Sequence, residues 1–224
     1  MIYFFGSDGT GKTTHADLVS SYLNRKGFKT WRASVKQHHT LSFLFLKLLT
    51  RKSPQGQATN YYGFPDDLAR KIRTPWKILE LASLVPAVFY RVLIPLSMGY
   101  VVVCDRYLLD SLVTLSYFLK EPKITLGIVA KLSVKLIPEN SFLVYFEADT
   151  NVILQRKKDE PLTRQLVEYY KKAYRTLAKW SGLTIIAIDT STKSVKEVQD
   201  KILPLISRNV TPEKKIVQIT GKLH

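Results

Sequence analysis

The sequence predicts an α/β fold, with a parallel sheet covered by helices on both faces. Short apolar runs, several of them aromatic or β-branched, alternate along the chain with longer segments whose apolar residues recur at helical spacing. The short runs are apolar at successive positions, which is typical of strands buried on both faces. A glycine-rich turn joins the first run to the first helical segment.

The expected strands are residues 2–5, 28–33, 100–104, 141–146 and 183–188. The expected helices are residues 12–26, 41–49, 76–96, 108–119, 124–136, 150–174 and 194–206. In the first helix, Ala16, Val19 and Leu23 share one face. Pro86 is expected to kink or end the long third helix, and Pro161 to break the sixth. Prolines and glycines between the second and third helices predict a loop over residues 51–67.

Length and composition indicate one globular domain with a basic surface. A chain of 224 residues suits a single α/β domain, and an apolar content of 46% excludes a disordered protein. The formal charge of +16, from 34 Lys and Arg against 18 Asp and Glu, suits a nucleic acid or a phosphorylated small molecule as partner. Because the basic residues are spread along the chain, we expect a small-molecule substrate and no nucleic acid.

Several classes of protein and of site are excluded or not expected. Cys104 is the only cysteine, which excludes an intrachain disulfide and a cysteine-rich metal site. The longest uncharged stretch, residues 92–104, is too short to span a bilayer. No signal peptide is expected either, so we expect a cytoplasmic protein with no membrane partner. Four histidines lack the spacing of metal ligands and are expected to be solvated or structural: His15, His38, His39 and His224.

Residues 6–14 match the phosphate-loop pattern G-x-x-x-x-G-K-[ST], between the first expected strand and the first expected helix. In such a loop, backbone N–H groups turn toward a polyphosphate, and the helix N-terminus adds partial positive charge. Lys12 would reach the β- and γ-phosphates, and the Thr13 hydroxyl would bind Mg²⁺. A chance glycine turn is the alternative, and the flanking strand and helix argue against it. The residues expected to bind a nucleoside triphosphate are Gly6, Ser7, Asp8, Gly9, Thr10, Gly11, Lys12, Thr13 and Thr14.

A second candidate site is Asp105-Arg106-Tyr107. These residues follow the expected strand 100–104, at the edge where ligands bind in open α/β sheets. Asp105 could hold Mg²⁺ through water, and Arg106 could grip a phosphate in a bidentate manner. The alternative is a salt pair at the strand end or an N-cap of the next helix. A phosphate loop on another strand of the same sheet favours the binding role.

Together these motifs resemble the thymidylate kinase family of P-loop nucleoside monophosphate kinases. The matching segments, in the family's order and spacing, are residues 5–14, 99–107, 145–149, 155–158, 166–178 and 188–191. The resemblance implies a three-layer P-loop kinase fold with a parallel sheet, in one domain over residues 1–206. It also implies a helical lid at about residues 153–165, and it leaves residues 207–224 as a basic C-terminal tail.

The resemblance implies roles for individual residues. Asp8 would lie near the acceptor sugar or a Mg²⁺-linked water, and Arg106 would hold the acceptor phosphate. Arg156, with Arg164, would close over the transferring phosphoryl group, and Thr190 to Thr192 would lie near the adenine. The implied reaction, in a homodimer, moves the γ-phosphoryl group of ATP, with Mg²⁺, onto dTMP to give dTDP. The implied catalytic residues are Lys12, Arg106, Asp8 and Arg156.

The acceptor-binding segments depart from the family pattern. The family's Arg-Glu-Pro-Gly-Gly is absent from residues 32–39, and its Ala-Tyr-Gln is replaced at residues 113–115. Its base-reading Phe-x-x-x-Arg corresponds to the uncharged residues 81–85. Gly9 stands where one branch has an arginine, so that the lid would supply this charge. The prediction that the acceptor base is thymine therefore rests on the resemblance alone. A kinase for another small acceptor and a non-catalytic, nucleic-acid-associated ATP-binding protein stay open as alternatives.

Overall fold

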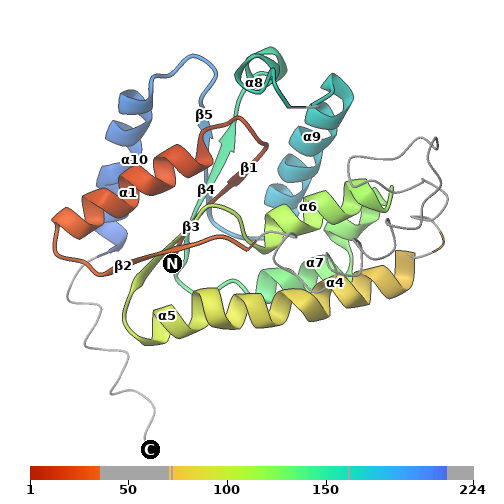
Figure 1. The fold of residues 1–224 in the computed structure, drawn as a ribbon, viewed down its shortest axis with the longest axis horizontal. Helices are drawn as coiled ribbons and strands as arrows, with labels where there is room; N and C mark the ends of the chain where they lie inside the picture. Colours follow the sequence, from red (N-terminus) through yellow and green to blue (C-terminus); the bar gives the residue numbers. More distant parts are fainter. Residues whose placement is uncertain (36–70, 72, 161, 211–224) are drawn as a thin grey trace, which may run out of the picture.

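The structure of the protein is a computed structural model that describes residues 1–35, 71, 73–160 and 162–210. These residues contain a five-stranded, all-parallel sheet with the strand order β2-β3-β1-β4-β5 (Figure 1). The strands are β1 (Ile2–Gly6), β2 (Thr30–Ala33), β3 (Val101–Cys104), β4 (Phe142–Glu147) and β5 (Ile185–Asp189). The predicted α/β class is confirmed, and the sheet with its flanking helices has the arrangement of a P-loop kinase fold.

Two helical layers cover the sheet. The α-helices are α1 (Lys12–Arg25), α4 (Arg73–Val88), α5 (Ile94–Ser97), α6 (Leu108–Phe118), α7 (Ile128–Lys135), α8 (Thr150–Arg156), α9 (Arg164–Trp180) and α10 (Val195–Asn209). On β1, Ile2 and Phe4 pack with residues of α1 and α10, whereas Tyr3 and Phe5 pack with residues of α4, α6 and α9. Because all four side chains are buried, the central strand has no solvent-facing side.

The long helix expected over residues 76–96 is not ended by Pro86. Helix α4 continues through Pro86, and the chain then forms a π-helical turn at Phe89–Leu93 before α5 begins. In this turn the Ile94 N–H donates to the Phe89 carbonyl, five residues back. The irregularity expected at Pro86 is therefore a π-helical turn, wider than an α-helical one, between Pro86 and Pro95, and the helix does not end there.

Two other expected helices are divided. Residues 124–136 form a 3-10 turn at Pro122–Leu126 and then α7, because Gly127 between them has an extended backbone. The expected helix 150–174 forms α8 and α9, on either side of Pro161, which lies outside the described residues. Helix α10 continues to Asn209, so the first residues of the expected tail are helical.

Other expectations lie outside the described residues. These are the helix at 41–49, the loop at 51–67, most of the tail, His38, His39 and His224.

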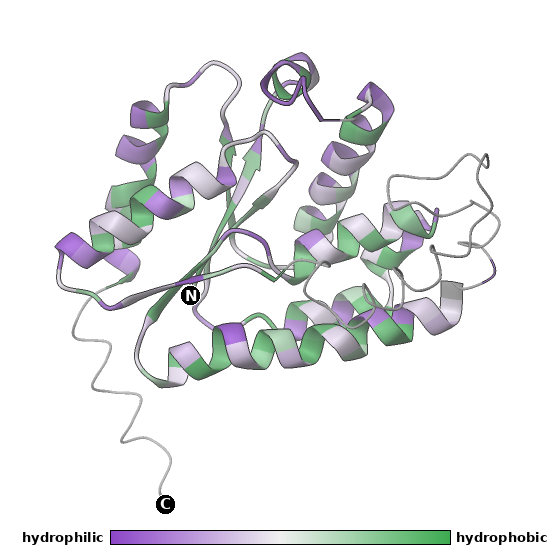
Figure 2. Cartoon of the chain, viewed as in Figure 1, coloured by the Kyte–Doolittle hydropathy of each residue, from purple (hydrophilic) through white to green (hydrophobic). Residues whose placement is uncertain are grey.

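One helical segment in the described part of the chain, Thr74–Ser97, is long and apolar enough to cross a membrane by length and composition alone. A core helix passes the same test, and one face of this segment does pack in the core through Leu84, Val88 and Val92. Figure 2 shows hydrophobic residues along much of α4 and α5. Exposed apolar side chains lie on α4, in the π-helical turn and directly after α5: Ile78, Val85, Phe89, Tyr90, Leu93 and Met98.

Candidate functional site

The phosphate loop follows β1 directly and leads into α1. Gly6, Gly9 and Gly11 have φ angles of 139°, 80° and 88°, which lie in the region that favours glycine. At Gly6 a side chain is also excluded by space, since a Cβ atom would lie 2.1 Å from the carbonyl oxygen of Phe146. The loop therefore has the backbone that the sequence pattern predicts, with the N-terminus of a fourteen-residue helix directed at it.

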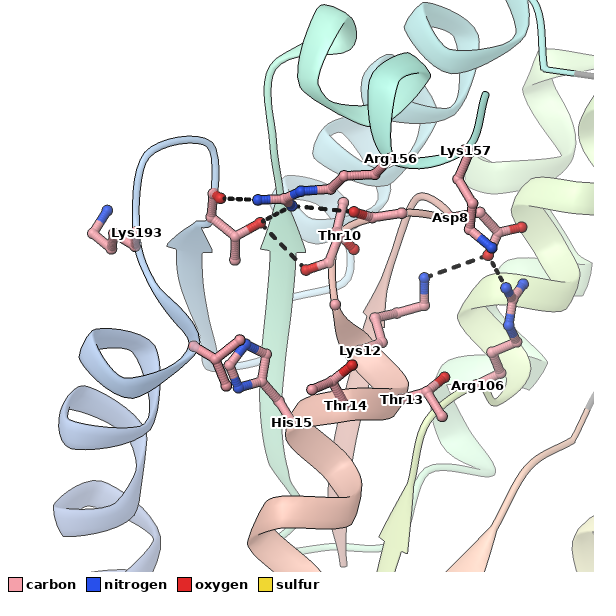
Figure 3. Close-up of a pocket in the computed structure, with 14 residues that line it drawn as sticks. Asp8, Thr10, Lys12, Thr13, Thr14, His15, Arg106, Arg156, Lys157 and Lys193 are labelled. Atoms are coloured by element: carbon pink, nitrogen blue, oxygen red, sulfur yellow. Dashed lines mark hydrogen bonds and ion pairs between the residues drawn. The ribbon is translucent and has the colours of Figure 1, made fainter. Parts of the chain in front are cut away.

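A pocket of about 410 Å³ lies over this loop (Figure 3). Its lining comes from the loop, the start of α1, the turn after β3, the end of α8 and the loop after β5. The lining residues are Asp8, Gly9, Thr10, Gly11, Lys12, Thr13, Thr14, His15, Arg106, Arg156, Lys157, Thr190, Lys193 and Val195. Five of these side chains are cationic and one is a carboxylate, so the pocket suits a polyanion.

Lys12 and Arg106 converge on Asp8 from separate elements (Figure 3). Lys12 Nζ lies 3.7 Å from Asp8 Oδ1 and donates to the Ser7 carbonyl at 2.7 Å. Arg106, in the turn between β3 and α6, forms an ion pair with the same carboxylate oxygen. Lys12 is 4% exposed, whereas the Arg106 side chain is 25% exposed. The two sites predicted separately from the sequence thus meet at one anionic position.

Arg156 closes the opposite side of the pocket. Its guanidinium donates to the Thr190 carbonyl at 2.7 Å, and to the Thr190 hydroxyl and the Gly9 carbonyl at 3.2 Å each. Thr190 Oγ1 lies 3.3 Å from the Thr10 carbonyl oxygen. These bonds join α8 to the phosphate loop and to the loop after β5. Arg164, the other expected lid arginine, does not line this pocket and donates to Asn151.

The loop after β5 is fixed by hydrogen bonds around Asp189. Its carboxylate accepts from the Ser191 N–H at 2.8 Å and from the Ser191 hydroxyl at 2.5 Å, and these bonds lower the pKa of Asp189. Lys193 Nζ donates to the Asp189 carbonyl at 2.9 Å. Lys193 and Val195 line the pocket beside Thr190. The sequence predicted residues 190–192 for this place but not Lys193 or Val195, although the position shortly after a strand end was a usable signal.

His15 also lines the pocket and is buried, with 3% of its surface exposed. Its ring stacks on Phe146 at a centroid distance of 5.1 Å, and Nδ1 lies 2.8 Å from Gln199 Nε2. Burial, and to a smaller extent the charge of Arg156, lower the pKa of His15 to about 4. The imidazole is therefore neutral near pH 7, and of the two roles expected from the sequence only the structural one fits.

Asp105 lies beside the pocket and not in its lining. Its carboxylate is 3.5 Å from Arg32 Nη2, while Arg32 also donates to Asp17 at 2.9 Å and to the Val103 carbonyl at 2.9 Å. Thr13, by contrast, is an exposed residue of the pocket lining. Among the described residues no three His, Cys, Asp or Glu side chains cluster closely enough to hold a metal ion by themselves.

The positions expected to face the acceptor base do not gather at one surface. Val85 is 51% exposed, and Leu115 is buried in the core. The buried face of α4 instead carries Trp76 and Glu80, which are 4% and 1% exposed. Glu80 lies one residue before the segment 81–85 that sequence reasoning treated as uncharged. The segment expected to read the base is therefore preceded directly by a buried carboxylate, which was not among the predicted residues.

Comparison with known proteins finds sequence similarity over part of the chain. A thymidylate kinase from Caldicellulosiruptor saccharolyticus is 36% identical to this chain over 113 residues. The aligned part covers 50% of this chain and 47% of that kinase, so the chain matches about half the length of this curated relative. No protein-family model matches the chain. The chain is thus similar to a thymidylate kinase over half its length.

Proposed function

We propose that the protein transfers the γ-phosphoryl group of ATP, with Mg²⁺, to a nucleoside monophosphate, with dTMP as the preferred acceptor. The observation that carries the proposal is the convergence of Lys12 and Arg106 on Asp8. One cation belongs to a phosphate loop and the other to a turn on a neighbouring strand. A pocket with cations on both sides can hold two phosphate groups against each other, as phosphoryl transfer requires.

Without ligands, the Asp8 carboxylate pairs with the two cations that would bind the donor and the acceptor phosphates. Arg106 would leave Asp8 for the acceptor phosphate, since its side chain is partly exposed and an arginine fork matches phosphate oxygens. Lys12, held by the Ser7 carbonyl, would stay with the β- and γ-phosphates. Most of the catalysis would come from positioning the two phosphates and neutralising their charge, which are the main requirements of this chemistry.

The residues present fit a magnesium ion bound together with the nucleotide. Mg²⁺ prefers hard oxygen ligands and keeps several waters, so one hydroxyl and the phosphates are enough on the protein side. The exposed Thr13 hydroxyl in the pocket lining would bind the ion directly, and Asp8 or Asp105 would act through water. The bound ion would neutralise charge that develops on the transferring phosphoryl group.

At the other side of the pocket we assign the adenine to the space beside Thr190, Lys193 and Val195. Arg156 is already bonded to Thr190 and Gly9 and would place its charge along the triphosphate. In this way α8 would supply the positive charge that Gly9 does not provide within the loop.

The test is ADP release from ATP and Mg²⁺, measured against dTMP, dUMP, dCMP, dGMP, AMP and a blank without acceptor. We expect release that depends on the acceptor and is largest with dTMP. ATP binding without ADP release for any acceptor would favour the non-catalytic alternative. Release only with an acceptor other than dTMP would keep the chemistry and correct the substrate.

We further propose that the protein is a homodimer and not membrane-bound, with the exposed apolar face of α4 and α5 as the interface. This face is defined by Ile78 and Val85 of α4 and by Phe89 and Leu93 of the π-helical turn, while Leu84, Val88 and Val92 of the same helical segment pack in the core. A second copy would bury it. Light scattering after size exclusion should give twice the chain mass, and Phe89→Glu should give the monomer. Binding of the wild type to neutral lipid vesicles would contradict this assignment.

A further inference from the structure

Asp110 is a buried carboxylate whose two oxygens are both hydrogen-bonded. It lies in the first turn of α6 and is 4% exposed. The Tyr174 hydroxyl donates to Oδ1 at 2.8 Å. The Tyr3 hydroxyl at 2.7 Å and the Tyr107 backbone N–H at 3.1 Å both donate to Oδ2. An ionised carboxylate with this many donors can stay buried, because hydrogen bonds to the charged form offset the loss of water.

The donors come from the elements that build the pocket. Tyr3 is on β1, the strand that ends at Gly6 and the phosphate loop. Tyr174 is on α9, which packs against α6, and Tyr107 directly follows Arg106. Burial, reinforced by Asp110, raises the pKa of Tyr3 and of Tyr174 well above the ordinary value, so both hydroxyls stay protonated donors. Asp110 therefore joins the phosphate-loop strand, α9 and the turn that carries Arg106.

The backbone around Arg106 is held from both sides. The Arg106 carbonyl accepts from the Val35 N–H at 2.9 Å and from the Cys104 thiol at 3.0 Å. The next N–H, that of Tyr107, donates to Asp110. With its peptide groups fixed, Arg106 can move only its side chain between Asp8 and a ligand.

We propose that Asp110 is a positioning residue that sets the reach of Arg106 toward the acceptor phosphate. This inference rests on the proposed function, because it assumes that Arg106 binds the acceptor. Asp110 is the third residue of α6 and accepts from the N–H of the N-cap residue Tyr107, a capping role that needs one acceptor and that an uncharged glutamine can fill. Asp110 adds two charge-assisted bonds to tyrosines of other elements, which orient the turn relative to the phosphate loop. Sub-ångström orientation of a phosphate-binding group affects the use of that substrate strongly.

The test compares three variants that weaken this network with one matched control. Tyr3→Phe and Tyr174→Phe each remove one hydroxyl donor, and Asp110→Asn removes the charge while keeping the shape. The control is Tyr169→Phe, because Tyr169 also bridges α9 to α6, through a 3.0 Å bond to the neutral Ser116 hydroxyl. For each protein we would measure kcat, the KM for dTMP, the Kd of a non-hydrolysable ATP analogue and the melting temperature.

We expect the KM for dTMP to rise about 10- to 100-fold in the Asp110, Tyr3 and Tyr174 variants, as for a misplaced binding group. The Kd of the ATP analogue should stay within about twofold of wild type, since the hydrogen bonds to Asp110 come from Tyr3, Tyr107 and Tyr174, which lie outside the phosphate loop. Tyr169→Phe should leave both constants unchanged.

Two results would overturn the inference while the wild type is active. In the first, the folded variants keep the wild-type KM for dTMP. In the second, KM and Kd rise together with a fall in melting temperature, and Tyr169→Phe behaves the same way, so that the network is only structural. A wild type that neither turns over nor binds any monophosphate is distinguishable from both results. That outcome contradicts the proposed function itself, and it removes the reason for positioning Arg106.

Discussion

The proposed donor end of the pocket, residues 6–14, and the proposed acceptor end, built around Arg106, are encoded in different ways. The donor end is one uninterrupted segment whose geometry follows from glycines and the start of α1. The acceptor end joins Arg106 to Asp8 and to a carboxylate that also bonds β1 and α9. A local segment can be predicted from its own pattern. A site assembled from distant segments depends on contacts that no spacing in the sequence shows.

The two ends also differ in how firmly their cations are held. Lys12 is nearly buried and bonded to the Ser7 carbonyl, whereas Arg106 is a quarter exposed and paired only with Asp8 among the residues described. A fixed cation suits the transferring phosphoryl group, and a movable one suits a substrate that must enter and leave. Mutations at the two ends should therefore affect different kinetic constants.

The largest effect is expected from Lys12→Ala at the donor end. We expect kcat to fall by about 10³-fold or more, as when a charge aimed at the transition state is removed. The melting temperature should change little, because Lys12 packs at the pocket and not among the apolar core side chains. Lys201→Ala, an exposed lysine on α10, is the matched control. Near-normal turnover by Lys12→Ala would break the assignment of the donor end.

At the acceptor end, Arg106→Ala should lower kcat/KM for the acceptor by about 10²- to 10³-fold, as loss of one charge-assisted phosphate contact does. Binding of an ATP analogue should change much less, because Arg106 lies on a different strand end from the loop. Calorimetry with the analogue and steady-state kinetics with the acceptor separate the two effects. If ATP binding collapsed while the acceptor KM stayed unchanged, Arg106 would belong to the donor end.

The sequence predicts the fold far better than it predicts the acceptor end. The strands were placed within a residue or two, because runs such as residues 101–103 are apolar throughout and bounded by turns. The π-turn after Pro86 was missed, since the local rule for proline allows a kink or an end and does not choose between them. Asp110 was missed because it follows the motif by one turn, and its tyrosine donors come from other elements. Glu80 lies one residue before the segment 81–85 and was therefore not considered, although it is buried on α4.

The prediction for His15, which lines the pocket at the donor end, concerns the free energy of unfolding and not the reaction rate. The unfolded chain keeps a histidine pKa of about 6.5, whereas in the folded protein burial lowers the pKa of His15 to about 4. Between these values only the unfolded state takes up the proton, so the free energy of unfolding falls as the pH falls through this window. Between pH 7 and about pH 4.5, protonation of this histidine in the unfolded state should lower the free energy of unfolding by about 2 kcal/mol.

The measurement is urea unfolding of the wild type and His15→Gln at both pH values. Glutamine does not titrate, so the wild type should lose about 2 kcal/mol more than the variant. Other acid-sensitive groups cancel in this double difference. Equal losses would mean that the imidazole is solvated in the folded protein, as one of the two sequence expectations had it.

The smallest effect is expected in the choice of base, where the acceptor end departs from the family pattern. Strong discrimination needs side chains that hydrogen-bond the base edge, whereas an apolar pocket separates substrates by only about 100-fold. Residues 81–85 offer no such group, so dUMP, dCMP and dGMP should have kcat/KM values within about 100-fold of dTMP. Competition rates under one condition give the ratios.

A variant of Glu80, which is buried on α4 just before this segment, tests whether a carboxylate reads the base. A site built to hydrogen-bond its substrate loses far more discrimination than an apolar pocket does when one partner is removed. A preference for dTMP of about 10⁴-fold or more that is lost in Glu80→Gln would therefore show that a buried carboxylate reads the base.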